Sequence, residues 1–321
     1  MRIRKIIQTI FFIYTIVAGI WFYVYINELK NENYNILKPS SVEGFLPISA
    51  LLGLKRFLLT GIYDPVHPAG LTILIAAIVM SIIVKKSFCS HICPVGFLSE
   101  LISNAGFKLK INRWISGFLG SLKYILLLFF LYVVFYQMNL QQITFFQNSS
   151  YNKIADAKML YFFLDISATG LMVIMALVLL TYLFKNFWCR FLCPYGALLG
   201  VLSWLSPFKI RRENENCIDC KKCREACPSD IEVYNKESIF TVNCIGCREC
   251  TKNETAVQQH CLKMISKTRY YGKYENLLSV AAPLIFLLIF IIAYLTGHWN
   301  STVSNEEYAR FLNSIRSLSH L

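Results

Sequence analysis

Long apolar segments alternate with polar segments along the whole chain. A helix of about 20 apolar residues is long enough to cross a lipid bilayer. Five segments come close to or reach this length, and they are residues 6–26, 68–84, 122–138, 166–184 and 277–296. The pattern therefore predicts an α-helical integral membrane protein with about five transmembrane helices. The first segment is a mainly apolar run of 21 residues, longer than the apolar core of a signal peptide, so we expect it to remain as an anchor.

Two features of the pattern depart from plain spans. Residues 42–59 are too short and too charged for a clear span, and we predict an interfacial or re-entrant segment there. Lys123 and Asp165 lie near the ends of predicted spans, where charged side chains commonly reach water. We therefore expect both side chains to be solvated rather than functional.

The distribution of basic residues predicts the orientation. The formal net charge is +13, which by itself would suit nucleic acid or an anionic membrane face. If the N-terminus is cytoplasmic, 24 of the 32 lysines and arginines fall in cytoplasmic segments, as the positive-inside rule requires. We therefore expect no nucleic-acid partner. We predict a multi-pass protein of the bacterial inner membrane, in which residues 213–266 face the reducing cytoplasm.

Eight cysteines between the fourth and fifth predicted spans form the strongest motif. Cys217, Cys220, Cys223 and Cys227, followed by Pro228, have the C-x2-C-x2-C-x3-C-P spacing of bacterial ferredoxins. Because the fourth cysteine of such a run ligates the other cluster, the sequence predicts two [4Fe–4S] clusters. Their ligand sets are Cys217, Cys220, Cys223 and Cys261 for one cluster, and Cys244, Cys247, Cys250 and Cys227 for the other.

Two questions about these eight cysteines remain open, the identity of the metal and the fourth ligand of the second cluster. Two structural zinc sites would also use CxxC pairs, although zinc has no use for the third close cysteine. Ten residues separate Cys250 from Cys261 and no proline follows, which leaves the fourth ligand of the second cluster open.

The other four cysteines belong to a repeat with an offset of 100 residues. Cys89, Cys93, Pro94 and Gly96 match Cys189, Cys193, Pro194 and Gly196. We interpret the repeat as a duplicated two-helix unit in parallel orientation. Since the residue before proline avoids the α region and proline suits the first helical turn, a new helix should begin at each proline. The four thiols are predicted to form a further metal or iron–sulfur site; the alternative is two pairs of buried or redox-active thiols.

Two histidines lie beside these motifs. His67, in a proline-rich segment on the predicted outer side, is a candidate contact for a quinone head group, and the alternative is an ordinary loop histidine. His91 lies between Cys89 and Cys93, but Phe191 takes its place in the second copy. A symmetric site would therefore not use His91.

The paired CxxxCP motifs and the eight-cysteine segment resemble the NapH/NosR-type polyferredoxin membrane proteins. Residues 41–50 and 64–70 resemble the YccM-like branch of this family. The resemblance covers about residues 39–261, and the chain lacks the large flavin-bearing domain of NosR. It implies electron transfer at a membrane, and NapH-type members imply quinol oxidation.

These observations predict three domains. Residues 1–212 form a four-helix membrane domain, residues 213–266 an inserted α+β two-cluster ferredoxin domain, and residues 267–321 the fifth span and an extracytoplasmic tail. The predicted function is electron transfer between the quinone pool and an unidentified redox partner, as a carrier subunit or as a component of a quinol dehydrogenase. The alternative is a cluster-based redox sensor or an assembly factor for a membrane oxidase or reductase.

Overall fold

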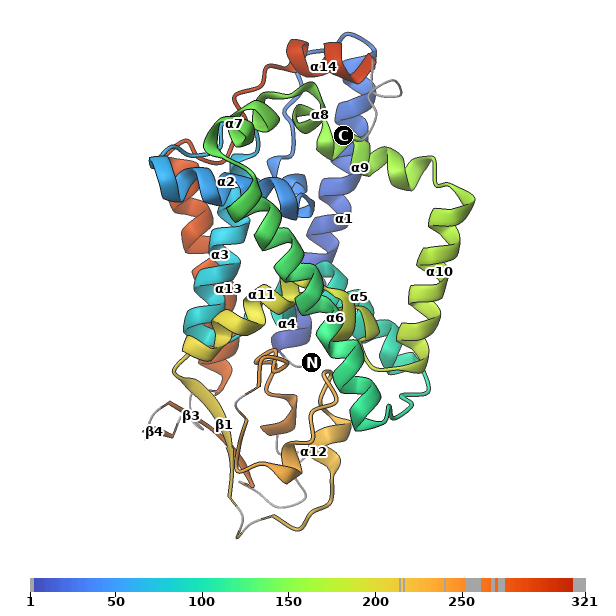
Figure 1. The fold of residues 1–321 in the computed structure, drawn as a ribbon, viewed down its shortest axis with the longest axis vertical. Coiled ribbons are helices and arrows are strands. Elements are labelled where there is room, and N and C mark those ends of the chain that lie inside the picture. The colour runs from blue at the N-terminus through green and yellow to red at the C-terminus, as the bar shows by residue number, and fades with distance from the viewer. Residues whose placement is uncertain are drawn as a thin grey trace. The chain divides into compact units, whose positions relative to one another are not determined.

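The computed structural model describes residues 3–213, 215, 217–239, 241–251, 261–266, 269–270 and 275–313. The described chain is mostly helical, with a few short strands (Figure 1). It divides into two units: unit 1 comprises Met1–Phe12, Ala77–Leu127 and Ile174–Phe286, and unit 2 comprises Ile13–Ala76, Leu128–Val173 and Leu287–Leu321. The predicted domain boundary at residue 267 lies outside the described residues.

Each predicted span coincides with a helix that begins in one unit and ends in the other. These helices are α1 (Ile3–Lys30), α3 (Pro68–Val84), α6 (Arg113–Leu131), α10 (Ala168–Leu183) and α13 (Glu275–Leu295). Consequently, the polar segments with the cysteine motifs belong to unit 1, and the remaining loops between spans belong to unit 2.

Two described helices are long and apolar enough to cross a membrane, Ile3–Lys30 and Trp114–Gln137. A third candidate is the pair α9 (Ala155–Leu164) and α10, which is bent by 82° at a short break. The segments Pro68–Val84 and Ser279–Leu295 are apolar helices of shorter length. The chain is thus mostly helical with two to three candidate spans.

Unit 2 contains a core formed by three distant parts of the chain. Four residues of α1 (Phe22, Tyr25, Ile26 and Leu29) pack with Ile154 and Ala157, and with Tyr308, Ala309 and Leu312 of α14 (Asn305–Asn313). The other short helices described in the unit are η1 (Ser40–Phe45), α2 (Pro47–Thr60), η2 (Tyr132–Gln137), α7 (Leu140–Asn148) and α8 (Ser150–Lys153). Proline begins α2, and Gly61 ends it with a left-handed φ of 71°, as glycine readily does.

Unit 1 contains a small antiparallel sheet with the order β2-β1-β3-β4. Its strands are β1 (Phe208–Arg212), β2 (Ser238–Ile239), β3 (Leu262–Ser266) and β4 (Arg269–Tyr270). Ile210 in β1 pairs with Ile239 on one side and with Met264 on the other. Ile210 and Ile239 pack in a buried cluster with Val233 and Leu262. The cluster also includes Cys244 and Cys250, so the sheet supports the segment that carries the cysteines.

One expectation about charged residues is wrong and another is confirmed. Lys123 of α6 is 1% exposed rather than solvated, and its ammonium donates to Oδ1 of Asn243 at 2.7 Å. Local sequence does not reveal this contact, because the two residues lie 120 positions apart. Asp165, at the end of α9, is exposed as expected.

Candidate iron–sulfur sites and a buried polar cluster

Proline begins a helix immediately after the second cysteine of each repeat copy, as predicted. Pro94 opens α5 (Pro94–Ala105), and Pro194 opens α11 (Pro194–Leu202). Cys93 and Cys193 are the N-cap residues, with extended φ/ψ of −61°/118° and −72°/107°. Each of these thiols therefore lies at the positive end of a helix dipole, where a negative charge is stabilised.

Backbone N–H groups of these first turns reach the sulfur atoms. The N–H of Gly196 donates to Sγ of Cys193 at 3.2 Å. In the other copy, burial raises the pKa of Cys93 to about 11, while N–H groups of Gly96 and Val95 oppose that rise. Hydrogen bonds of this kind stabilise a thiolate, the form that ligates metals.

The four repeat cysteines lie close enough to influence one another's ionisation. Burial raises the pKa of Cys89 to about 12, and the charges of Cys93 and Cys193 add to the rise. The pKa of Cys189 is raised by burial and by the charges of the other three thiols. The structure thus brings together the two CxxxCP pairs that the sequence places 100 residues apart.

A lysine supplies positive charge to this group of sulfurs. Lys86 is 3% exposed, and its charge lowers the pKa of Cys89. A Cβ atom added to Gly196 would lie 3.3 Å from Nζ of Lys86 and 3.5 Å from Sγ of Cys193. Four thiols, two of them at helix N-termini, and a buried cation form a donor set that fits an anionic iron–sulfur cluster.

The eight cysteines of residues 213–266 also gather as two groups of four. In the first group, Cys217 and Cys261 share a hydrogen bond. The charges of Cys217 and Cys220 raise the pKa of Cys223. The charge of Cys223 in turn raises the pKa of Cys261. In the second group all four thiols are buried and line one cavity, and they are Cys227, Cys244, Cys247 and Cys250. Four convergent thiols fit a cubane cluster.

The repeat also holds the cysteine segment through a pair of lysines that the sequence analysis missed. Nζ of Lys85 donates to the carbonyl oxygen of Ile239 at 3.2 Å. Nζ of Lys185, at the same position of the second copy, donates to the carbonyl oxygen of Glu225 at 2.8 Å. The shared lysine at the start of each copy was the signal that could have revealed this role.

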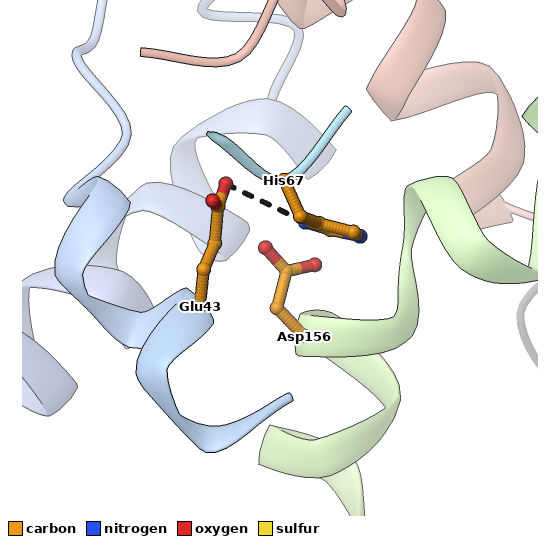
Figure 2. Close-up of side chains that lie close together, drawn as sticks. All are labelled: Glu43, His67 and Asp156. Atoms are coloured by element: carbon orange, nitrogen blue, oxygen red, sulfur yellow. Dashed lines mark ion pairs between the residues drawn. The ribbon is translucent and has the colours of Figure 1, made fainter. Parts of the chain in front are cut away.

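Unit 2 holds a separate polar cluster around His67 (Figure 2). His67, Glu43 and Asp156 are 0%, 0% and 3% exposed, and one ligand atom from each lies within 4.8 Å of the others. Lys38 joins them, with Nζ 3.1 Å from Oε1 of Glu43 and 2.6 Å from Oδ2 of Asp156. Sequence reasoning singled out His67 alone, because its partners come from two other segments of the chain, around residues 38–43 and at Asp156.

Comparison with known proteins places these features in a family. The model described as "4Fe-4S binding domain" matches residues 66–112 and 166–213, which contain the two CxxxCP copies. YccM of Escherichia coli (strain K12), a protein named for electron transport, is 37% identical over 308 residues, which cover 94% of this chain and 86% of YccM.

Two more distant relatives share about half of the chain. The ferredoxin-type protein NapH of Haemophilus influenzae is 26% identical over 57% of this chain and 65% of its own length. The regulatory protein NosR of Pseudomonas aeruginosa is 24% identical over 58% of this chain, but over only 26% of NosR. No solved structure matches the chain.

Proposed function

The chain belongs to the YccM-like family of iron–sulfur electron transport proteins, and from this premise we propose that it exchanges electrons between the membrane quinone pool and a redox protein partner. Two [4Fe–4S] clusters in residues 213–266 carry the electrons. The observation that carries the proposal is the gathering of eight cysteines into two groups of four in unit 1.

Each cysteine group holds one cluster in this proposal. Cys217, Cys220, Cys223 and Cys261 hold the first, and Cys227, Cys244, Cys247 and Cys250 hold the second. A bound [4Fe–4S] cluster supplies one-electron transfer, and its potential depends on nearby charge, hydrogen bonds to sulfur and solvent exposure. The chain sets these conditions: the second group is buried, whereas Cys220 of the first group is exposed.

The four repeat cysteines hold a third cluster. The family model for 4Fe–4S binding covers both copies, and the structure adds the helix N-termini and Lys86. These features favour an anionic cluster over two independent thiol pairs, because unligated thiols do not need the charge of Lys86 or the N–H groups. Zinc remains the alternative metal for a four-thiol site.

The proposed topology has five spans, with residues 213–266 in the cytoplasm of a bacterial inner-membrane protein. The division into units supports the five spans, because the helix at each of them contains residues of both units. Of the 32 lysines and arginines, 24 fall in the segments that this topology assigns to the cytoplasm, as the positive-inside rule requires. The domain limits at residues 212 and 266 are part of this proposal.

Metal and sulfide analysis of anaerobically purified, full-length protein tests the cluster assignment. Two clusters correspond to about eight iron and eight acid-labile sulfide atoms per chain, and a third raises each to about twelve. Colourless protein that contains zinc and no sulfide would reject the redox function.

A quinol analogue added to the same protein tests the partner. Reduced-cluster signals in the electron paramagnetic resonance (EPR) spectrum are the expected result. The names of NosR relatives favour regulation as a second candidate function, and clusters that dithionite reduces but quinol does not would support that alternative.

A further inference from the structure

The hydrogen bonds around His67 fix the position of its proton. Nε2 lies 2.6 Å from the backbone carbonyl oxygen of Asn152. A carbonyl oxygen only accepts, so Nε2 carries the hydrogen. In the neutral ring, Nδ1 is then a bare acceptor.

Nδ1 of His67 points at another acceptor. It lies 3.5 Å from Oε1 of Glu43 (Figure 2), and it is buried without a hydrogen-bond partner. Two lone pairs facing each other in a buried site are unfavourable, and a buried polar atom without a partner costs about 1–3 kcal/mol. One added proton on Nδ1 removes both penalties by creating a charge-assisted N–H···O bond.

Glu43 is held in the form that attracts this proton. Its Oε2 accepts the N–H groups of Ala69 and Gly70 at 3.0 and 3.3 Å, in the first turn of α3, and its Oε1 accepts from Lys38. All of these partners are donors, as an ionised carboxylate requires, and a helix N-terminus favours negative charge.

The summed charge of Glu43, Asp156, Lys38 and His67 favours the binding of one added proton. Asp156 accepts from Tyr308 at 2.6 Å and from the N–H of Ala157 at 2.9 Å, and it pairs with Lys38. With two carboxylates, one ammonium and a neutral imidazole, the group has one excess negative charge. A proton on His67 makes it neutral, which a buried site favours.

We propose that Nδ1 of His67, held against Glu43 in this buried cluster, is a proton-binding site of the protein. The proton comes from water or from a neighbouring acid and converts the imidazole to imidazolium, while Glu43 and Asp156 stay ionised. The inference deepens the proposed function, on which its role rests, because a quinol releases protons together with electrons. His67 then serves quinone chemistry through a proton, without contact with the head group.

The charges around His67 favour its protonated form overall. Burial lowers the pKa of His67, but the interaction with the Glu43 carboxylate outweighs burial and raises the pKa overall. Lys38 opposes this rise and Asp156 supports it. Asp64, whose Oδ1 accepts the backbone N–H of His67 at 3.1 Å, is a further acidic neighbour.

A divalent cation is the competing occupant, because the same three side chains converge. The ammonium of Lys38, 3.1 and 2.6 Å from the two carboxylates, already provides their positive charge. A metal ion would have to displace it or lie beside it, and the structure therefore favours the proton.

Nitrogen NMR of histidine-labelled, full-length protein in lipid nanodiscs tests the proposal. The chain has five histidines, and His67→Gln assigns the signal. The expected result is a neutral form with the hydrogen on Nε2 that gains its second proton above pH 6.5, the approximate pKa of an unperturbed imidazole. Glu43→Gln should lower this transition by about one pH unit or more, whereas Glu306→Gln, an exposed control, should leave it unchanged.

Three outcomes would overturn the proposal. They are a His67 that stays neutral at pH 6, a transition that Glu43→Gln does not move, and stoichiometric zinc binding that His67→Gln abolishes. Iron content and EPR signals of the same samples separate the two claims. Intact clusters with an unprotonated His67 reject this inference alone, whereas absent clusters reject the proposed function.

Discussion

Arg4 and Glu249 form a buried ion pair across 245 positions of the chain, with Nη1 of Arg4 2.7 Å from Oε1 of Glu249. Arg4 also pairs with Glu100 of α5 and donates to the carbonyl oxygen of Ser90 at 3.1 Å. It therefore connects the start of α1, the first CxxxCP copy and the second cysteine group. Burial raises the pKa of Cys247 to about 12, and the charge of Arg4 opposes that rise.

We expect Arg4→Gln to lower the reduction potential of the cluster held by Cys247. Removal of a buried positive charge disfavours the reduced, more negative cluster, by on the order of tens of millivolts. Redox titration followed by EPR measures the shift. Lys5→Gln, at an exposed neighbouring position, is the control, and equal potentials in both variants would contradict the prediction.

The proposal that the fourth cysteine of each run ligates the cluster of the other run is testable by iron content. Alanine at Cys217, Cys220 and Cys223 should remove one of the two clusters in residues 213–266. About four iron atoms, those of the other cluster, should then remain in this segment. Adding Cys227→Ala should remove these four as well, whereas adding Cys261→Ala should not. The opposite pattern would mean that each run of cysteines holds its own cluster.

The two repeat glycines should differ in their tolerance of alanine. A Cβ on Gly96 would lie 2.5 Å from the backbone carbonyl oxygen of Cys89, whereas a Cβ on Gly196 meets the flexible end of Lys86 at 3.3 Å. Gly96→Ala should therefore destabilise the protein by about 1–3 kcal/mol and Gly196→Ala by less. Thermal unfolding in detergent compares them, and equal Tm values would contradict the difference.

The buried Lys123 and the half-buried Asn243 should be energetically coupled. Asn243→Leu leaves a buried ammonium without its acceptor and should cost about 1–3 kcal/mol. Lys123→Met alone should cost less, and the double variant should recover part of the loss caused by Asn243→Leu. A double-mutant cycle of unfolding free energies measures the coupling, and strictly additive losses would show that the contact contributes nothing.

The raised pKa of His67 predicts a pH dependence of stability. A group whose pKa is higher in the folded state stabilises the fold below its unfolded pKa, about 6.5, and this contribution disappears as pH rises through the folded pKa. The Tm should therefore fall as pH rises from about 6.5 through the His67 transition, and His67→Gln should abolish that part of the change. A wild-type Tm that is flat over this range would contradict the prediction.

Local sequence determined the features that depend on neighbouring residues. Proline after Cys93 and Cys193 placed two helix starts correctly, because proline restricts its own residue and the one before it. The apolar segments predicted the helices, although only two or three described candidates meet the length and composition of a span. The cysteine spacing and repeat led to the family that the comparisons then showed.

Only the tertiary structure decided which distant polar groups meet. Arg4 with Glu249, Lys123 with Asn243 and His67 with Glu43 are pairs of polar residues from different segments, and five of these six residues are buried. The sequence singled out His67 but not its partner, and Lys123 had every local sign of a solvated charge. The physical reason is that a buried charge requires a partner, and chain folding supplies that partner from a segment that local sequence does not identify.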